Sequence, residues 1–282
     1  MDWKSTNTLS SPDLLAVIRK GKMKCAAAGC KRIATDRHHI DHNHSNNNPS
    51  NLAPACKLCH DKEHGITAEI NELKLLTRQF YTIQDQRKAL ASRIGAYKRL
   101  ELPTEHVEKA FEDVKETEAK LKHYIEEMLR TNSFYNAWLK HVKGIGPLLS
   151  ASIITEIGSP ERFNTVGQLI SYAGENVIRG KARRREKGNK ANWNGQLKMT
   201  LYKIASSFIK YDCFGRRLYD EYKQYYIDRD GAEPKHKAHN RALRRVGKDF
   251  LRCTYLAWLE HIGKPMNRAR PETKVFPDNW IE

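Results

Sequence analysis

Apolar residues recur at alternating steps of three and four positions over residues 67–131, the spacing of one face of a long helix. The first series runs from Leu73 to Tyr97, with Arg87 as its one polar exception, and a second follows Pro103. The pattern predicts two helices of roughly 30 residues each, joined near the proline. They can form a hairpin or pair with a second chain, and the sequence leaves both arrangements open.

A helical pattern also covers residues 132–263. Its last helix, expected from about Lys235 to His261, has basic residues near its start and an apolar stripe further on. The stripe consists of Leu243, Val246, Phe250, Leu251, Tyr255 and Leu259. Residues 264–282 contain three prolines and are expected to form an irregular tail.

Residues 1–66 differ from the rest, because the part from Cys25 to Gly65 is rich in cysteine, histidine and asparagine and lacks a periodic apolar pattern. The sequence therefore predicts a mainly α protein in four parts. These are a small head (1–66), a coiled-coil-like helical spacer (67–131), an all-α region (132–263) and a tail (264–282).

Four of the six cysteines lie in the head as two close pairs, Cys25-x4-Cys30 and Cys56-x2-Cys59. With no secretion signal in the sequence, such pairs indicate a metal site in preference to disulfides. A 40-residue module buries too little apolar surface to fold alone, so we expect these four thiolates to hold a structural Zn²⁺. Cys213 and Cys253 stand alone in helical sequence and are expected to be buried small side chains.

The 50 Lys and Arg residues outnumber the 33 Asp and Glu residues, giving a formal charge of +17. Such an excess favours a polyanionic partner, nucleic acid above all. No run of about 18 apolar residues occurs, and residues 1–14 lack the hydrophobic core of a signal peptide. A membrane or secreted protein is therefore disfavoured, and we expect a cytoplasmic, nucleoid-associated one.

The head also contains an unusual set of histidines, His38 and His39 together and His60 and His64 four positions apart. If a helix begins near Lys57, the second pair shares one helix face. A strand would direct His38 and His39 to opposite sides, so that one binds a metal while the other reaches a water molecule.

Three segments of the head together resemble the HNH endonucleases with a ββα-metal fold. They are His38-His39-Ile40-Asp41, Pro49-Ser50-Asn51-Leu52 and Cys56-Lys57-Leu58-Cys59-His60. The resemblance implies that His39 is the general base, that Asn51 braces the loop carrying it, and that His38, His60 and His64 bind a catalytic divalent cation. Three imidazoles suit Zn²⁺, Ni²⁺, Co²⁺ or Mn²⁺ better than Mg²⁺, but the sequence leaves the working ion open, Mg²⁺ included.

Two features of residues 132–263 point to DNA. Glycines two positions apart in Lys143-Gly144-Ile145-Gly146-Pro147 resemble the helix-hairpin-helix motif, which binds the DNA backbone through exposed N–H groups. The run from Arg179 to Lys190 holds seven basic residues and one acidic residue. The candidate DNA contacts are Lys143, Gly144, Gly146, Arg179, Lys181, Arg183, Arg184, Arg185 and Lys187.

Residues 134–262 as a whole resemble the C-terminal domain of insertion-sequence transposases that use a nucleophilic serine. The similarity rests on the Gly-Ile-Gly turn, Glu156-Ile157-Gly158, the segment from Leu169 to Gly174, the basic run and the last helix. However, no serine occurs between Ser171 and Ser206, and the Cys/His head replaces the family's acidic catalytic domain. Only DNA binding is therefore carried over from this resemblance.

Taken together, these features predict a metal-dependent HNH endonuclease that hydrolyses DNA phosphodiester bonds, from a mobile element or phage. The alternatives are a non-cleaving DNA-binding or recombination accessory protein, or a transposase that uses another nucleophile. The expected partners are DNA and, through residues 67–131, a second copy of the chain. Whether a guide RNA takes part, and whether one strand or two are cut, is left open.

Overall fold

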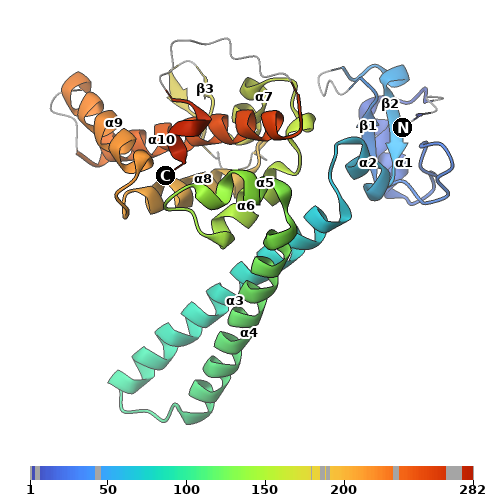
Figure 1. Cartoon of the computed structure of the whole chain (residues 1–282). Helices are drawn as coiled ribbons and strands as arrows, with labels where there is room; N and C mark the ends of the chain where they lie inside the picture. Colours follow the sequence, from blue (N-terminus) through green and yellow to red (C-terminus); the bar gives the residue numbers. More distant parts are fainter. Residues whose placement is uncertain are drawn as a thin grey trace. The chain divides into compact units, whose positions relative to one another are not determined.

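The computed structural model describes residues 2–3, 7–41, 46–178, 180–184, 188, 191–230, 235–264 and 275–281. The chain divides into two compact units, Met1–Ala68 and Glu69–Glu282 (Figure 1). The predicted mainly α fold is confirmed, since the strands of the described residues form only two short antiparallel hairpins.

Unit 1 is built around a two-stranded sheet followed by a helix. Strands β1 (Asp36–His39) and β2 (Leu52–Ala55) pair antiparallel, with His39 opposite Leu52. The short helix η1 (Pro49–Asn51) leads into β2, and α2 (Lys57–Glu63) follows it. The first helix, α1 (Ser11–Arg19), packs its apolar side on this sheet, where Leu14 and Leu52 are fully buried.

Unit 2 begins with the long helices α3 (Ala68–Arg99) and α4 (Glu105–Thr131), which run antiparallel as a hairpin (Figure 1). Arg87, the polar exception in the apolar series, forms an ion pair with Glu118 of the opposite helix. Nearer the turn, Lys98 and Glu108 pair at 2.8 Å. Of the two arrangements open to these helices, the structure therefore shows the intrachain hairpin.

The rest of unit 2 is a layered set of shorter helices around α10 (Lys235–His261), which contacts α7, α8 and α9. Five residues of its predicted apolar stripe are buried and Leu259 is half-buried. The neighbouring elements are α5 (Ser133–Ala137), η2 (Leu139–His141), α6 (Pro147–Ile157), η3 (Pro160–Arg162), α7 (Val166–Tyr172), α8 (Gly195–Phe208) and α9 (Phe214–Asp230). One hairpin of two-residue strands, β3 (Val177–Ile178) and β4 (Lys181–Ala182), interrupts the otherwise helical order.

Residues 275–281 contribute to the core of unit 2 although the sequence predicts an irregular tail. They include η4 (Pro277–Trp280), whose Trp280 ring lies 5.1 Å from the rings of Phe208, Phe214 and Phe250. The indole N–H of Trp138 donates a hydrogen bond to the carbonyl of Pro277. Cys213 and Cys253 are buried in the same unit, as their isolated positions predict.

Among the described helices, none combines the length and the apolar character needed to cross a bilayer.

Candidate functional site

The four cysteines of the head come together as one cluster. The sulfur atoms of Cys25, Cys30, Cys56 and Cys59 all lie within 4.8 Å of one another. Cys56 immediately precedes α2 and Cys59 lies in its first turn, so the short x2 spacing brings both thiols to one helix end. Four thiols at this separation match the preference of zinc for a tetrahedron of sulfur ligands, and the cluster could therefore hold a structural zinc.

The thiols of this cluster differ in acidity. Burial pushes the pKa of Cys56 upward, but hydrogen bonds from the Cys59 backbone and from neighbouring thiols outweigh it and lower this pKa to about 7. Burial and the same neighbours raise the pKa of Cys59 to about 12. Because zinc binds thiolates, occupation of the cluster would release protons, and acid would oppose it.

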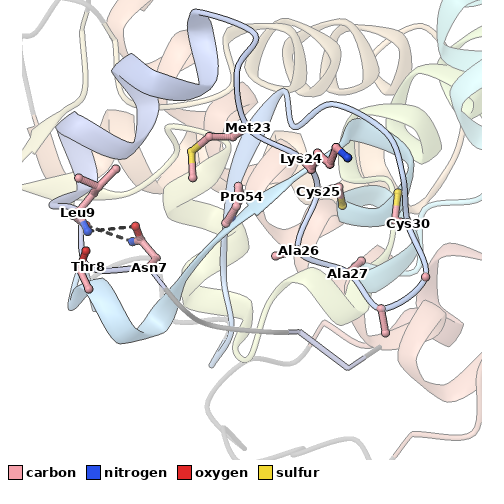
Figure 2. A pocket seen from close by; sticks show the side chains of 12 residues that line it. Asn7, Thr8, Leu9, Met23, Lys24, Cys25, Ala26, Ala27, Cys30 and Pro54 are labelled. Atoms are coloured by element: carbon pink, nitrogen blue, oxygen red, sulfur yellow. Dashed lines mark hydrogen bonds between the residues drawn. The ribbon is translucent and has the colours of Figure 1, made fainter.

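A hollow of about 550 Å³ lies beside Cys25 and Cys30 (Figure 2). Small and apolar residues such as Ala26, Met23 and Pro54 contribute most of its lining. The titratable side chains in its lining are Lys24 and the thiols of Cys25 and Cys30.

Three histidines form a second cluster in the same unit. One ring nitrogen from each of His38, His60 and His64 lies within 4.8 Å of the others. His38 lies in β1, His60 lies in α2, and His64 caps the end of α2 one turn later. The strand and the helix therefore direct their imidazoles toward one another. His38 and His64 are buried and His60 is half-buried.

The donor set of this cluster fits a divalent transition metal ion. Neutral imidazoles bind Zn²⁺, Ni²⁺, Co²⁺ and Mn²⁺, and three of them leave coordination positions for other ligands. The geometry thus brings together the three residues that the resemblance to HNH endonucleases implies as ligands of a catalytic ion.

His39 lies on the opposite side of β1 from His38, as the two-residue period of a strand requires. It is 5 % exposed, and its Nε2 lies 3.2 Å from the side-chain oxygen of Asn47. If Nε2–H donates this bond, the lone pair of the ring is on Nδ1. Asn47 belongs to an asparagine-rich loop, and the sequence gives no reason to single it out from its neighbours.

Asn51 fastens the two ends of the loop after β1. Its side-chain oxygen accepts a hydrogen bond from the backbone N–H of Asp41 at 3.0 Å. Its amide nitrogen donates to the Asp41 carboxylate at 2.8 Å and to the carbonyl of Asn46 at 2.9 Å. The Asn51 side chain therefore joins Asp41 to Asn46.

The Gly144–Gly146 turn of unit 2 is fixed by close packing. Gly144 has φ of +93°, and a Cβ added there would lie 3.0 Å from the ring of Phe208. The hydroxyl of Ser207 donates a hydrogen bond of 2.7 Å to the Gly144 carbonyl. Gly146 then precedes α6, whose first residue is Pro147, and the exposed Lys143 flanks the turn.

The described basic residues of the run lie in β4 and directly after it. Arg183 is half-buried and Arg184 is exposed, while Lys181 belongs to β4. Three of the candidate contacts, Arg179, Arg185 and Lys187, lie outside the described residues.

Two cations anchor the ends of the β3–β4 hairpin. The Lys198 ammonium donates hydrogen bonds to the carbonyls of Gly174 and Arg183, at 3.1 and 2.9 Å. Arg244 pairs with the buried Glu175 carboxylate at 2.6 Å and also donates to the Glu175 carbonyl. Burial, followed by Arg244 and Arg183, lowers the pKa of Lys198, although Glu175 opposes this shift.

Residues 136–220 match the model of a family described as Transposase IS116/IS110/IS902. The matched segment contains the Gly144–Gly146 turn, the β3–β4 hairpin, α8 and the start of α9. It leaves the cysteine and histidine clusters of unit 1 outside. The match supports the resemblance of residues 134–262 to a transposase domain, which the sequence indicates. No curated protein matches the chain.

Proposed function

We propose that the protein is a metal-dependent DNA endonuclease of the HNH type, with its reaction centre in unit 1 and its main DNA-backbone contacts in unit 2. The observation that carries this proposal is the joint placement of four histidines. Three converge as a cluster from β1 and α2, and His39 lies on the other side of the same strand. The similarity of residues 136–220 to a transposase family supports DNA as the substrate.

Hydrolysis of a phosphodiester needs an activated water and stabilisation of the charge on the phosphate and the leaving 3′ oxygen. A divalent cation at His38, His60 and His64 would supply that stabilisation when bound. His39 would take the proton of the attacking water at Nδ1, while Asn47 holds Nε2–H and fixes the ring. Asn51 would maintain the position of the following loop.

In unit 2, Lys143 and the N–H groups of Gly144 and Gly146 would bind backbone phosphates, and the residues directly after β4 would add contacts from Arg183 and Arg184. Phosphate contacts of this kind orient a protein on DNA without reading its sequence. The anchoring of the β3–β4 hairpin by Lys198 and Arg244 supports this role, because a fixed loop loses little conformational freedom on binding.

The proposed base is tested with supercoiled plasmid and Mg²⁺, Mn²⁺, Ni²⁺ or Zn²⁺ in parallel reactions. We expect His39→Ala to lower the nicking rate by about 100-fold or more, the usual contribution of a general base. His123→Ala removes an exposed histidine of α4 and should cut like the parent. Equal rates for His39→Ala and the parent would show that the base is assigned wrongly.

The proposed ion site is tested by metal content. The parent loaded with zinc and then with Ni²⁺ should bind one zinc and one nickel per chain, measured by mass spectrometry of the native protein. His60→Ala should retain the zinc and lose the nickel. If His60→Ala retains both ions, the histidine cluster is not the nickel site.

The proposed DNA contacts are tested by salt dependence. Arg184→Ala should weaken binding to all duplex sequences alike and reduce the slope of log K against log salt by about one. A change confined to particular sequences would instead indicate base contacts.

The family match favours a second candidate, a transposase-related protein that binds DNA in recombination. That function predicts salt-sensitive binding with no nicks under any metal, or strand joining in place of hydrolysis.

One reaction centre per chain would cut one strand, so a homodimer through residues 67–131 is our proposed route to a double-strand break. Addition of RNA to the plasmid reaction tests whether a guide takes part.

A further inference from the structure

We propose that Trp3 is a positioning residue of the histidine cluster and that it couples this cluster to the cysteine cluster. The inference rests on the proposed metal site, and it concerns a residue that no motif of the sequence singles out. Trp3 lies in unit 1 with both clusters, so every contact used below is internal to one compact unit.

The indole of Trp3 stacks on the imidazole of His38. The ring centroids are 4.4 Å apart and the planes are inclined by 27°. The other two members of the cluster meet His38 differently, since His60 and His64 approach it edge-on, at 5.5 and 5.3 Å with inclinations of 80° and 65°. His38 is thus held by an aromatic plane against one face and by the other imidazoles at an angle to it.

This enclosure fixes the rotation of the His38 ring. A rotation about its last side-chain bond would drive the imidazole into the stacked indole, so the ring nitrogen that faces His60 and His64 stays in place. Indole offers no ligand atom to a metal ion. Trp3 would therefore act by orienting His38 and by excluding water from one of its faces.

The position of Trp3 depends on the loop that carries two of the zinc ligands. Trp3 forms an isolated antiparallel bridge with Ala27, and the backbone N–H of Ala28 donates a 3.1 Å hydrogen bond to the carbonyl of Asp2. Both alanines lie between Cys25 and Cys30. Filling of the cysteine cluster would order this loop, the loop would hold Trp3, and Trp3 would hold His38.

The inference is tested by nickel binding to the full-length, zinc-loaded chain, with isothermal titration calorimetry as the readout and Ni²⁺ alone as the probe. Trp3→Ala should weaken Ni²⁺ binding by about tenfold, the low end of the effect of residues that orient metal ligands. Trp3→Phe retains an aromatic plane and should stay within about twofold of the parent. Trp193→Ala removes a half-buried indole of unit 2 and should bind Ni²⁺ like the parent.

A third variant separates stacking from space filling. Trp3→Leu supplies apolar volume without a ring, so we expect it to bind Ni²⁺ as weakly as Trp3→Ala. Zinc content and the thermal unfolding of each variant are measured alongside. Parent-like Ni²⁺ affinity in Trp3→Leu would overturn the proposal. In that case any loss of affinity in Trp3→Ala would be attributed to loss of zinc or of packing volume.

A spectroscopic readout tests the same contact without catalysis. Ni²⁺ quenches the fluorescence of a nearby indole, so the quenching seen in the parent should be absent in Trp3→Phe and intact in Trp193→Phe. If the parent itself binds no Ni²⁺ beyond the zinc site, the proposed metal site is wrong. If the parent binds Ni²⁺ and the Trp3 variants match it in affinity, only the positioning role is wrong.

Discussion

The two compact units have cores of different size and composition. The apolar core of unit 1 is small, with Leu14, Ile18, Ala34 and Leu52 as its buried members, and two ligand clusters lie beside it. The core of unit 2 is continuous and aromatic, with Phe208, Phe250 and Trp280 at its centre. A unit stabilised by metal can bury polar ligands that an apolar core would exclude.

The two units also differ in which polar groups they bury. In unit 1 they include the histidines of the proposed reaction centre, His38, His39 and His64. In unit 2 two buried carboxylates are paired with cations, Glu175 with Arg244 and Glu156 with Lys74 at 3.5 Å, while the buried Asp249 accepts a hydrogen bond from the Tyr222 hydroxyl. In unit 2 these ion pairs join elements that are distant in the sequence.

The largest effect that this comparison predicts is the unfolding of unit 1 when its proposed zinc site is removed. Cys56→Ser should abolish the protection of amides of residues 7–41 and 46–64 against hydrogen exchange, because structural zinc contributes about 10–16 kcal/mol in small zinc modules. Unit 2 should keep its protection. Cys213→Ala, a change to a buried cysteine of unit 2, is the control and should leave unit 1 protected. Full protection of unit 1 in Cys56→Ser would show that its apolar core is sufficient.

A smaller but still large effect is expected from the aromatic core of unit 2. Trp280 is 2 % exposed, and Trp280→Ala should lower the free energy of unfolding by about 3–5 kcal/mol through the cavity it leaves. Urea unfolding followed by circular dichroism measures the loss. Trp193→Ala, at a half-buried position, should have a clearly smaller effect. Equal losses for the two variants would mean that residues 275–281 contribute little to the core.

The smallest effect concerns the α3–α4 hairpin. Burial pushes the pKa of Glu118 up, but hydrogen bonds from Arg87 and Gln84 outweigh it and lower this pKa below its ordinary value of 4.5. A lowered pKa in the folded state means that the carboxylate stabilises the fold above pH 4.5 and that this contribution disappears as the pH falls through the folded-state pKa.

Glu118→Gln should therefore lower stability by about 0.5–1 kcal/mol at pH 7 and by nothing measurable once the carboxyl of the parent is protonated. Thermal unfolding of both proteins from pH 7 down to pH values well below 4.5 provides the comparison. Glu112→Gln, which removes an exposed pair with Lys115 on one helix, is the matched control and should show a weaker pH dependence. A constant difference between Glu118→Gln and the parent at all pH values would exclude the ion pair as its cause.

Much of the fold could be predicted because it depends on local periodicity. The three- and four-residue spacing located α3 and α4, and the apolar stripe located α10, since helices display their buried face at regular intervals. The pairing of α3 with α4 within the chain was not predictable from local pattern. It brings Arg87 to Glu118, 31 positions further along the chain, and periodicity carries no information about such a contact.

The candidate site was predictable to the extent that its residues lie in short motifs. The spacing of the cysteines predicted the first cluster, and the resemblance to HNH endonucleases implied the second. Asn47 and Trp3 were missed: one is among several asparagines, and the other lies 35 positions before the ring on which it stacks.

The sequence by itself determined the helical periodicity, the positive charge and the ligand types, all of which are properties of residues and of their near neighbours. Only the tertiary structure decided which distant groups meet. Ser207 reaches the Gly144 turn, Trp280 enters the aromatic core, and Trp3 stacks on His38. Each of these contacts is made possible by the packing of whole elements, and its stabilising energy is gained only once those elements have assembled.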